Sequence, residues 1–254
     1  MFPNLWIFDT YSICLVVGVF VAILVLYQYL KKNTGNMQYA YSVLILATLT
    51  ILFGILSATL FQYIFNLLDG INEFGAMTFY GGLIGGTGFF ILFYFIFIKK
   101  KYNISILNIV IIAPACIALA HAFGRIGCFA DGCCYGIETD SFLGVKFPFL
   151  DHKVYPTQLF ESAFLFILGG LLYYLAIKKN NKYTMPIYLL SYGVWRFLIE
   201  FIRGDDRGAR LFGLYPAQVI SILLVLAGII LIILIIKKVL FKEPNEELEK
   251  GETE

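Results

Sequence analysis

The sequence predicts an all-α, polytopic integral membrane protein with seven transmembrane helices. Of its 254 residues, 60% are hydrophobic and 14% are charged, whereas soluble domains are about half apolar and about a quarter charged. Seven apolar segments are close to or above the roughly 20 residues that a helix needs to cross a bilayer. We expect them at about 11–30, 39–64, 77–98, 104–124, 156–177, 183–202 and 215–236. They form one membrane domain, 1–238, and the highly charged tail, 239–254, is expected to be disordered.

Lysines flank these segments on alternate sides. Lysine clusters follow the first, third, fifth and seventh segments, at 31–32, 99–101, 178–182 and 237–238. Because cytoplasmic loops are enriched in lysine and arginine, this pattern places the N-terminus outside and the tail in the cytoplasm. The loops 65–76, 125–155 and 203–214, which carry the unusual residues, are then all expected on the outer face. No lysine or arginine precedes the first segment, as it would in a cleaved signal peptide, and the net charge of +2 does not indicate nucleic-acid binding.

The third and fourth segments each carry a motif. The third begins FYGGLIGG, in which Tyr80 precedes glycines that allow close helix packing. Tyr80 is either an aromatic anchor at the membrane interface or part of a polar site. The fourth ends in HAFGRIGCFADGCCYG, which places Arg125 where the apolar run ends, in a glycine-rich turn that closes with Gly136. An arginine at the end of a membrane segment, where glycines allow close backbone approach, indicates an anion-binding site.

The fifth segment begins YPTQLFES. Pro156 suits the first turn of a helix, and Gln158 and Glu161 lie three residues apart on one helix face. These two polar side chains are either helix-interface residues or groups that bind or orient a substrate.

The sixth segment ends YGVWRFLIEFIRGDD. Four of its polar residues fall within roughly 80° of arc on one helix face: Tyr192, Arg196, Glu200 and Arg203. Glu200 is spaced to pair fully with only one of the two arginines, so the remaining positive charge favours an anionic head group as the missing partner. The alternative is a buried salt bridge that only locks helix packing.

Five cysteines are present, three of them in the expected outer loop: Cys128, Cys133 and Cys134. Disulfides persist on this side of a membrane, so we expect a bridge from Cys128 to Cys133 or Cys134 that braces the loop. A reactive cysteine is the alternative. A zinc site with His121 is less favoured, because the spacing lacks a paired C-x-x-C.

Taken together, these motifs resemble the phosphatidylglycerol–prolipoprotein diacylglyceryl transferases. The resemblance covers most of the chain, through the seven-segment topology and four motifs in matching order: FYGGLIGG, GRIGCFADGCCYG, YPTQLFES and YGVWRFLIEFIRGDD. It implies a membrane enzyme of lipoprotein biosynthesis in the bacterial plasma (inner) membrane, with its active site toward the outer face. Such an enzyme transfers the diacylglyceryl group of phosphatidylglycerol to the lipobox cysteine thiol of a prolipoprotein and releases glycerol 1-phosphate. Its partners are these two substrates and the surrounding membrane lipids, and no metal or organic cofactor is implied.

Carried over residue by residue, Arg125 corresponds to the family's lipid-binding signature arginine, and Gly136 closes that signature. Tyr192 and Arg196 correspond to its sixth-segment motif, which Glu200 and Arg203 complete. The sequence departs from the family at three positions. Many members have a histidine in place of Tyr80, an asparagine in place of Cys128 and an acidic residue in place of Cys133.

The implied reaction suggests roles for these residues. Arg125 and Arg196 would clamp the phosphate, because cations stabilise the charge that develops on the leaving group, and Arg203 would steer anionic lipid. Tyr80 or Tyr192 would relay the proton of the acceptor thiol. Other hypotheses are a transferase of the same fold with a different acceptor, an anionic-lipid transporter and a thiol-redox membrane protein.

Overall fold

The computed structural model describes residues 4–5, 8–68, 78–204 and 213–240, and it is almost entirely helical. Seven helical segments are long and apolar enough to span a membrane, as predicted. They are α1 (Thr10–Thr34), α2 (Met37–Leu68), the segment Gly81–Tyr102, α5 (Leu107–Asp131), α6 (Thr157–Lys179), the segment Thr184–Ile202 and α8 (Pro216–Ile236). Many large apolar side chains on these helices are exposed, as expected for surfaces that contact lipid. A hairpin of two residues per strand, β1 (Asn4–Leu5) and β2 (Phe8–Asp9), precedes α1 and is a small addition to the predicted all-α fold.

The chain divides into two compact units. One unit contains Met1–Leu26 and Ile109–Glu254, and the other contains Tyr27–Asn108. The expected tail lies outside the described residues from residue 241 onward, as do most of the loop 65–76 and most of the loop 203–214.

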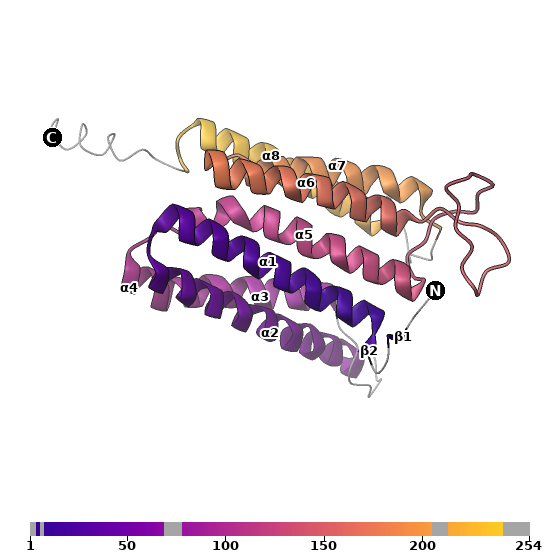
Figure 1. The fold of residues 1–254 in the computed structure, drawn as a ribbon, viewed down its shortest axis with the longest axis horizontal. Coiled ribbons are helices and arrows are strands. Elements are labelled where there is room, and N and C mark those ends of the chain that lie inside the picture. Colours follow the sequence, from indigo (N-terminus) through magenta and orange to yellow (C-terminus); the bar gives the residue numbers. More distant parts are fainter. Residues whose placement is uncertain (1–3, 6–7, 69–77, 205–212, 241–254) are drawn as a thin grey trace. The chain divides into compact units, whose positions relative to one another are not determined.

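In the unit Tyr27–Asn108, α2 packs against α3 (Phe79–Phe93), which continues through a π-helical turn, Tyr94–Lys99, into α4 (Lys100–Tyr102) (Figure 1). Glycine makes the α2–α3 contact possible. A methyl group on Gly82 would meet the backbone oxygen of Gly54 at 3.2 Å, and the hydroxyl of Ser57 donates to the carbonyl of Gly81 at 2.8 Å. The glycines of FYGGLIGG therefore serve close helix packing, as predicted.

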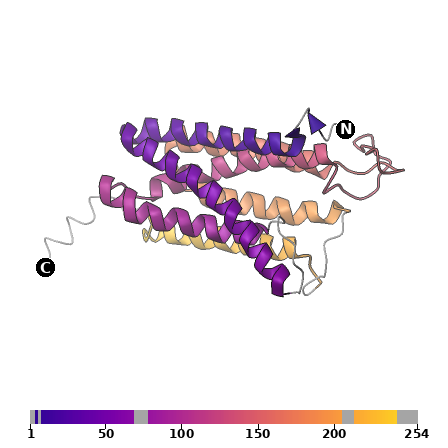
Figure 2. The ribbon, with the colours of Figure 1, turned by 90° about the horizontal axis from the view of Figure 1, so that it is seen from below.

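In the other unit, glycines allow close approach at three helix contacts. A methyl group on Gly18 of α1 would meet the backbone of α5 at 2.9 Å, and one on Gly169 of α6 would meet Leu119 of α5 at 2.8 Å. A methyl group on Gly193 of α7 (Thr184–Ile199) would likewise meet the backbone oxygen of Ser221 in α8 at 3.0 Å. The loop between α5 and α6 extends past the ends of these helices (Figures 1 and 2).

Three helix ends differ from the sequence predictions. The predicted end of the fourth segment near 124 is wrong, because α5 continues to Asp131 and Arg125 is therefore inside a helix. The sixth segment ends at Ile202 as predicted, but its α-helical part, α7, stops at Ile199 and the last turn, Glu200–Ile202, is a 3-10 helix. Arg203 has an extended backbone and does not share the helix face of Tyr192. Pro156 lies directly before α6 rather than in its first turn.

Candidate active site

The carboxylate of Glu161 lies at the centre of a buried polar cluster between three helices of one unit. Glu161, on α6, is only 2% exposed. Its Oε2 is 2.9 Å from Nε of Arg125 on α5, and its Oε1 accepts a hydrogen bond from the hydroxyl of Tyr192 on α7 at 3.0 Å. The imidazole Nε2 of His121 is 3.9 Å from the same Oε1. From the sequence, Glu161 was either a helix-interface residue or a group that binds or orients a substrate. In the structure its carboxylate connects α5, α6 and α7.

The helical continuation of α5 explains why His121 and Arg125 act together. Residues four apart lie on one helix face, so both side chains point toward α6. The ring of His121 packs edge-on against Tyr192, with 5.4 Å between the ring centroids, and Tyr192 stacks on Tyr188 at 5.7 Å. The sequence suggested His121 only as a ligand of a less favoured zinc site, and its spacing of four from Arg125 is the signal that could have placed it in this cluster.

A second ion pair lies one turn further along α7. Arg196 NH1 is 3.0 Å from Oε2 of Glu200, whose side chain is fully buried. Of its two possible partners, Glu200 forms this ion pair with Arg196. The positive charge of Arg196 also acts on Glu161, so both arginines share one electrostatic environment.

The two guanidinium groups retain unused donors. A guanidinium has five N–H donors, and each arginine forms one ion pair with a carboxylate, through Nε of Arg125 and through NH1 of Arg196. Among the described residues, neither guanidinium has a further hydrogen bond or ion pair. The pair can therefore accept an anion with several oxygen atoms without losing its carboxylate partners.

The three loop cysteines meet at the end of α5. Their Sγ atoms all lie within 4.8 Å of one another, and all three are free thiols. A Schellman turn ends α5 and begins at Cys128. The amide of Cys133 donates to the carbonyl of Cys128 at 3.1 Å, and the amide of Gly132 donates to the carbonyl of Phe129 at 3.2 Å. In this turn the first and last side chains lie in contact. Gly132 has φ +80° and Cys134 has φ +64°, so the chain bends twice and brings the third sulfur to the same point.

The close approach of the three sulfur atoms shifts the pKa values of the loop thiols. The hydrogen bond from Cys128 raises the pKa of the Cys133 thiol. Hydrogen bonds from Cys128 and Cys133, together with the charge of Arg203, hold the pKa of the Cys134 thiol well below its usual range. The cluster thus favours negative charge on sulfur at Cys134. The predicted disulfide brace stays a prediction.

Gln158 supports this loop. Its side chain is 1% exposed and its Nε2 donates to the carbonyl of Cys133 at 2.5 Å. The adjacent Thr157 donates to the carbonyl of Cys134 at 2.8 Å. Both bonds join the start of α6 to the turn, so the structure gives Gln158 an orienting position.

Gly136 lies where the loop crosses the segment after α7. It forms a backbone bridge with Arg203, and a methyl group there would meet the carbonyl oxygen of Ile202 at 2.6 Å. Only glycine allows this approach, and the crossing fixes the backbone of Arg203. Tyr80 lies in the first turn of α3 in the other unit, and its side chain is outside the described part of the structure.

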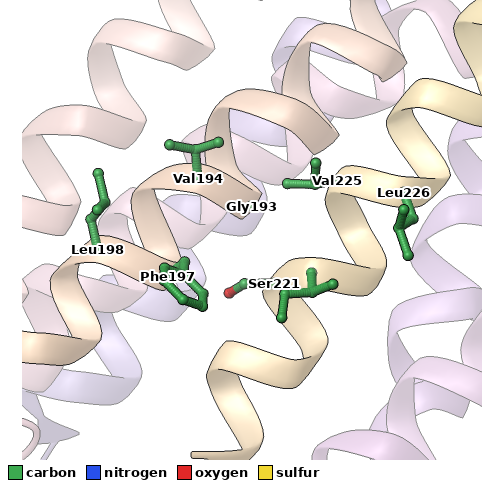
Figure 3. A pocket seen from close by; sticks show the side chains of 8 residues that line it. Gly193, Val194, Phe197, Leu198, Ser221, Val225 and Leu226 are labelled. Carbon is green, nitrogen blue, oxygen red and sulfur yellow. The ribbon is translucent and has the colours of Figure 1, made fainter. Parts of the chain in front are cut away.

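An apolar groove of about 300 Å³ lies along the contact between α7 and α8 (Figure 3). It is lined by Gly193, Val194, Phe197, Leu198, Ser221, Ile222, Val225 and Leu226. In Figure 3 the side chains of Phe197 and Ser221 point toward one another across it. The hydroxyl of Ser221 donates to the carbonyl of Ala217 at 2.7 Å, so the groove offers an apolar surface and no catalytic group.

These features define a multi-pass membrane protein with an internal site built from arginines, carboxylates and thiols. The family model for prolipoprotein diacylglyceryl transferase matches residues 5–234. The chain is 33% identical over 232 residues to the phosphatidylglycerol–prolipoprotein diacylglyceryl transferase of Clostridium tetani, covering 86% of this chain and 90% of the relative. It is 33% identical over 244 residues to that of Streptococcus uberis, covering 88% and 89%. It is also 40% identical over 168 residues to transferase 2 of Clostridium perfringens, covering 63% of each.

The chain belongs to the prolipoprotein diacylglyceryl transferase family. The resemblance stated from its four motifs is thereby confirmed, and the chain is a membrane transferase.

Proposed function

We propose that this protein transfers the diacylglyceryl group of phosphatidylglycerol to the lipobox cysteine thiol of a prolipoprotein, releasing glycerol 1-phosphate. One observation carries the proposal. Two largely buried guanidinium groups, those of Arg125 and Arg196, each form an ion pair with a glutamate and keep donors that have no partner in the described part of the chain. A phosphodiester supplies the oxygen atoms that these donors lack.

The arginines act on the leaving group. Each cation about 4 Å from the phosphate contributes on the order of 4 kcal/mol at an effective dielectric of 20. Negative charge on the phosphate grows as the glyceryl C–O bond breaks, so fixed guanidinium groups stabilise the transition state more than the bound lipid. Glu161 and Glu200 orient the two arginines, and Arg203, which follows the turn after α7, steers anionic lipid toward them.

The acceptor thiol must lose its proton before sulfur attacks carbon. Tyr192 donates its own hydrogen bond to Glu161, which leaves it poorly arranged to accept a proton. His121 lies in the same cluster, and an imidazole accepts protons near neutral pH far better than a phenol does. We assign the proton-accepting role to His121, while Tyr80 remains the earlier alternative.

The site faces the outer side of the bacterial plasma membrane. Arg125 lies near the C-terminal end of α5 and Glu161 near the N-terminal end of α6, whereas Lys178 and Lys179 lie at the C-terminal end of α6 and lysines 99–101 precede α5 in the sequence. Because lysine-rich ends stay in the cytoplasm, the cluster belongs to the outer half of the membrane. Reporter domains fused after Lys101 and after Lys238 test this, and both are expected to be cytoplasmic.

Purified protein, phosphatidylglycerol and a lipobox peptide suffice to test the activity. The peptide is expected to gain the mass of one diacylglyceryl group. A peptide with serine in place of the lipobox cysteine and one that lacks the lipobox serve as control acceptors, and phosphatidylethanolamine serves as the control lipid. Modification of the non-lipobox peptide alone would assign a different acceptor, and lipid translocation without any mass gain would indicate a transporter.

A further inference from the structure

The three-thiol cluster at the end of α5 has the dimensions of a metal site. Its Sγ atoms lie within 4.8 Å of one another. Around a tetrahedral zinc ion with Zn–S bonds of about 2.3 Å, neighbouring sulfur atoms are about 3.8 Å apart. Small side-chain rotations close this difference. The sequence spacing argued against zinc, but the Schellman turn and the positive φ of Cys134 supply a convergence that no C-x-x-C motif provides.

The backbone around the cluster is fixed before any ligand binds. The carbonyl groups of Cys133 and Cys134 are held by Gln158 and Thr157 of α6. A methyl group on Gly132 would meet the ring of Phe149 at 2.6 Å, so the turn is packed as well as hydrogen-bonded. Metal sites with such supporting contacts need little rearrangement on binding.

We propose that Cys128, Cys133 and Cys134 bind one Zn²⁺ ion as thiolates and leave its fourth position open for the thiol of the acceptor cysteine. Structural zinc sites have four protein ligands, whereas catalytic sites have three and an exchangeable position. Among the residues that the structure describes, only these three cysteines form a group able to hold a metal. This inference deepens the proposed function, on which its catalytic part rests, because the substrate of that reaction is itself a thiol.

The charges around the cluster suit an anionic metal centre. Three thiolates and one Zn²⁺ carry a net charge of −1. The guanidinium of Arg203 acts on Cys134, and that of Arg125 acts on both Cys128 and Cys134. These cations offset the excess negative charge. Arg125 therefore connects the thiol cluster with the position proposed for the phosphate, so nucleophile and leaving group meet at one residue.

The chemical step balances without any oxidant or reductant. The acceptor thiol binds Zn²⁺ and releases its proton to His121, the proton acceptor of the proposed function, because a metal-bound thiol ionises at neutral pH. The bound sulfur attacks the glyceryl carbon next to the phosphate oxygen. A C–S bond forms, the C–O bond breaks, and its electron pair leaves with glycerol 1-phosphate. The thioether product is uncharged and a weaker ligand than a thiolate, so it leaves the metal and the next acceptor binds.

Metal content tests the site independently of catalysis. The full-length protein is purified in detergent under anaerobic conditions without added reductant, which would break a disulfide, and its zinc is measured by elemental analysis. We expect one zinc ion per chain in the wild type, and loss of that zinc in Cys128→Ser and Cys133→Ser. Cys14→Ser and Cys116→Ser are matched controls that should retain it. Equal zinc in the wild type and in Cys128→Ser would overturn the proposal. A wild-type protein that contains no zinc and has a mass two hydrogens lower would also overturn it, because that mass indicates the disulfide brace. Copper bound in preference to zinc would also overturn it, since Cu⁺ is satisfied by three thiolates.

Cobalt substitution in the wild-type protein tests the open position and needs no folded variant. Co²⁺ bound by thiolates absorbs in the near ultraviolet in proportion to their number. Adding the lipobox peptide without lipid should raise this absorbance by about a third, and the peptide with serine in place of cysteine should leave it unchanged. No difference between the two peptides would overturn the open position. A cobalt response without later lipid transfer would instead leave the site standing and refute the proposed function.

Discussion

The two compact units bury polar groups in opposite ways. In the unit Tyr27–Asn108 the buried contacts are between uncharged groups: the hydroxyls of Tyr39 and Tyr94 are 3.3 Å apart, and Ser57 donates to a backbone carbonyl. In the other unit, Glu161 and Glu200 are almost completely buried and each forms an ion pair with an arginine.

This difference separates packing from chemistry. Inserting a charged residue at the centre of a membrane helix costs about 2.5–3.5 kcal/mol by insertion scales, and a hydrogen bond between membrane helices contributes only about 0.6 kcal/mol on average. If the arginines of α5 and α7 only joined helices, hydroxyl contacts of the kind that join α2 and its neighbours would serve at lower cost. We therefore expect that substitutions in the charged cluster mainly lower the rate of lipid transfer. Substitutions in the α2–α3 contact should mainly lower the stability of the fold.

Replacing Arg125 should give the largest loss of activity. Arg125→Ala is expected to lower the rate of lipid transfer by about 10²–10³-fold, the range for one lost donor to a developing negative charge. Arg125→Lys keeps the charge but not the planar fork and should recover only part of the rate. Mass measurement of the lipobox peptide gives the rates.

A stability control is needed because Arg125→Ala leaves Glu161 buried and unpaired. Breaking a buried pair costs about 3–5 kcal/mol. The double variant Arg125→Met with Glu161→Gln removes both charges and should regain most of the thermal stability in detergent without regaining transfer. Recovery of transfer in this variant would show that the ion pair only locks helix packing.

Glu161→Gln should have the next largest effect. The amide keeps the shape of the carboxylate but loses its charge, so Arg125 is no longer held firmly. Hydrogen bonds to charged groups contribute about 1.5–3 kcal/mol, which corresponds to a loss of about ten- to hundredfold in kcat/KM. Because Glu161 positions an arginine that contacts the phosphate in both the bound lipid and the transition state, kcat should fall and KM for phosphatidylglycerol should rise, and Glu161→Asp should restore part of both. A loss confined to kcat would contradict the positioning role.

The membrane segments could be predicted because their signal is local. Apolar length and flanking lysines depend only on neighbouring residues, and seven spans resulted at nearly the expected positions. The end of α5 could not be predicted in this way. Gly124 and Gly127 suggested a turn, yet they are helical, and a methyl group on Gly127 would meet Tyr11 of α1 at 2.9 Å. Glycine serves close packing here, and only the partner helix reveals that.

The sequence indicated which residues make up the candidate site better than it indicated how they are arranged. The sequence identified Arg125, Arg196 and Glu200, because charged residues in apolar segments are conspicuous. It could not reveal that Glu161 joins three helices, since that depends on contacts between residues 31 to 40 positions apart. Nor could it place Cys134, whose sulfur reaches the cluster through a left-handed backbone that non-glycine residues rarely adopt.

A pair of glycines in α3 tests the packing side of the comparison. A methyl group on Gly85 would collide with the side chain of Ser57, whereas one on Gly88 would meet nothing within 4 Å. Gly85→Ala is expected to destabilise the protein by about 1–3 kcal/mol through overpacking, and Gly88→Ala should be neutral or slightly stabilising. Thermal denaturation in detergent measures both. Transfer per folded molecule should stay unchanged in Gly85→Ala, and a selective loss of activity there would remove the distinction between the two units.

Among the changes in the charged cluster, Tyr192→Phe should have the smallest effect on transfer. The variant removes one hydroxyl that donates to Glu161 but keeps the ring that stacks on Tyr188 and packs against His121. A single hydrogen bond contributes about 0.5–1.5 kcal/mol, so the rate should fall by no more than about tenfold, with the pH dependence of kcat unchanged. If Tyr192 instead relayed the thiol proton, the loss would be about 10²–10⁴-fold, as for other general acid–base groups, and the pH profile would shift. The size of this one change therefore decides whether the hydroxyl orients Glu161, as the geometry indicates, or takes part in proton transfer, as the sequence alone allowed.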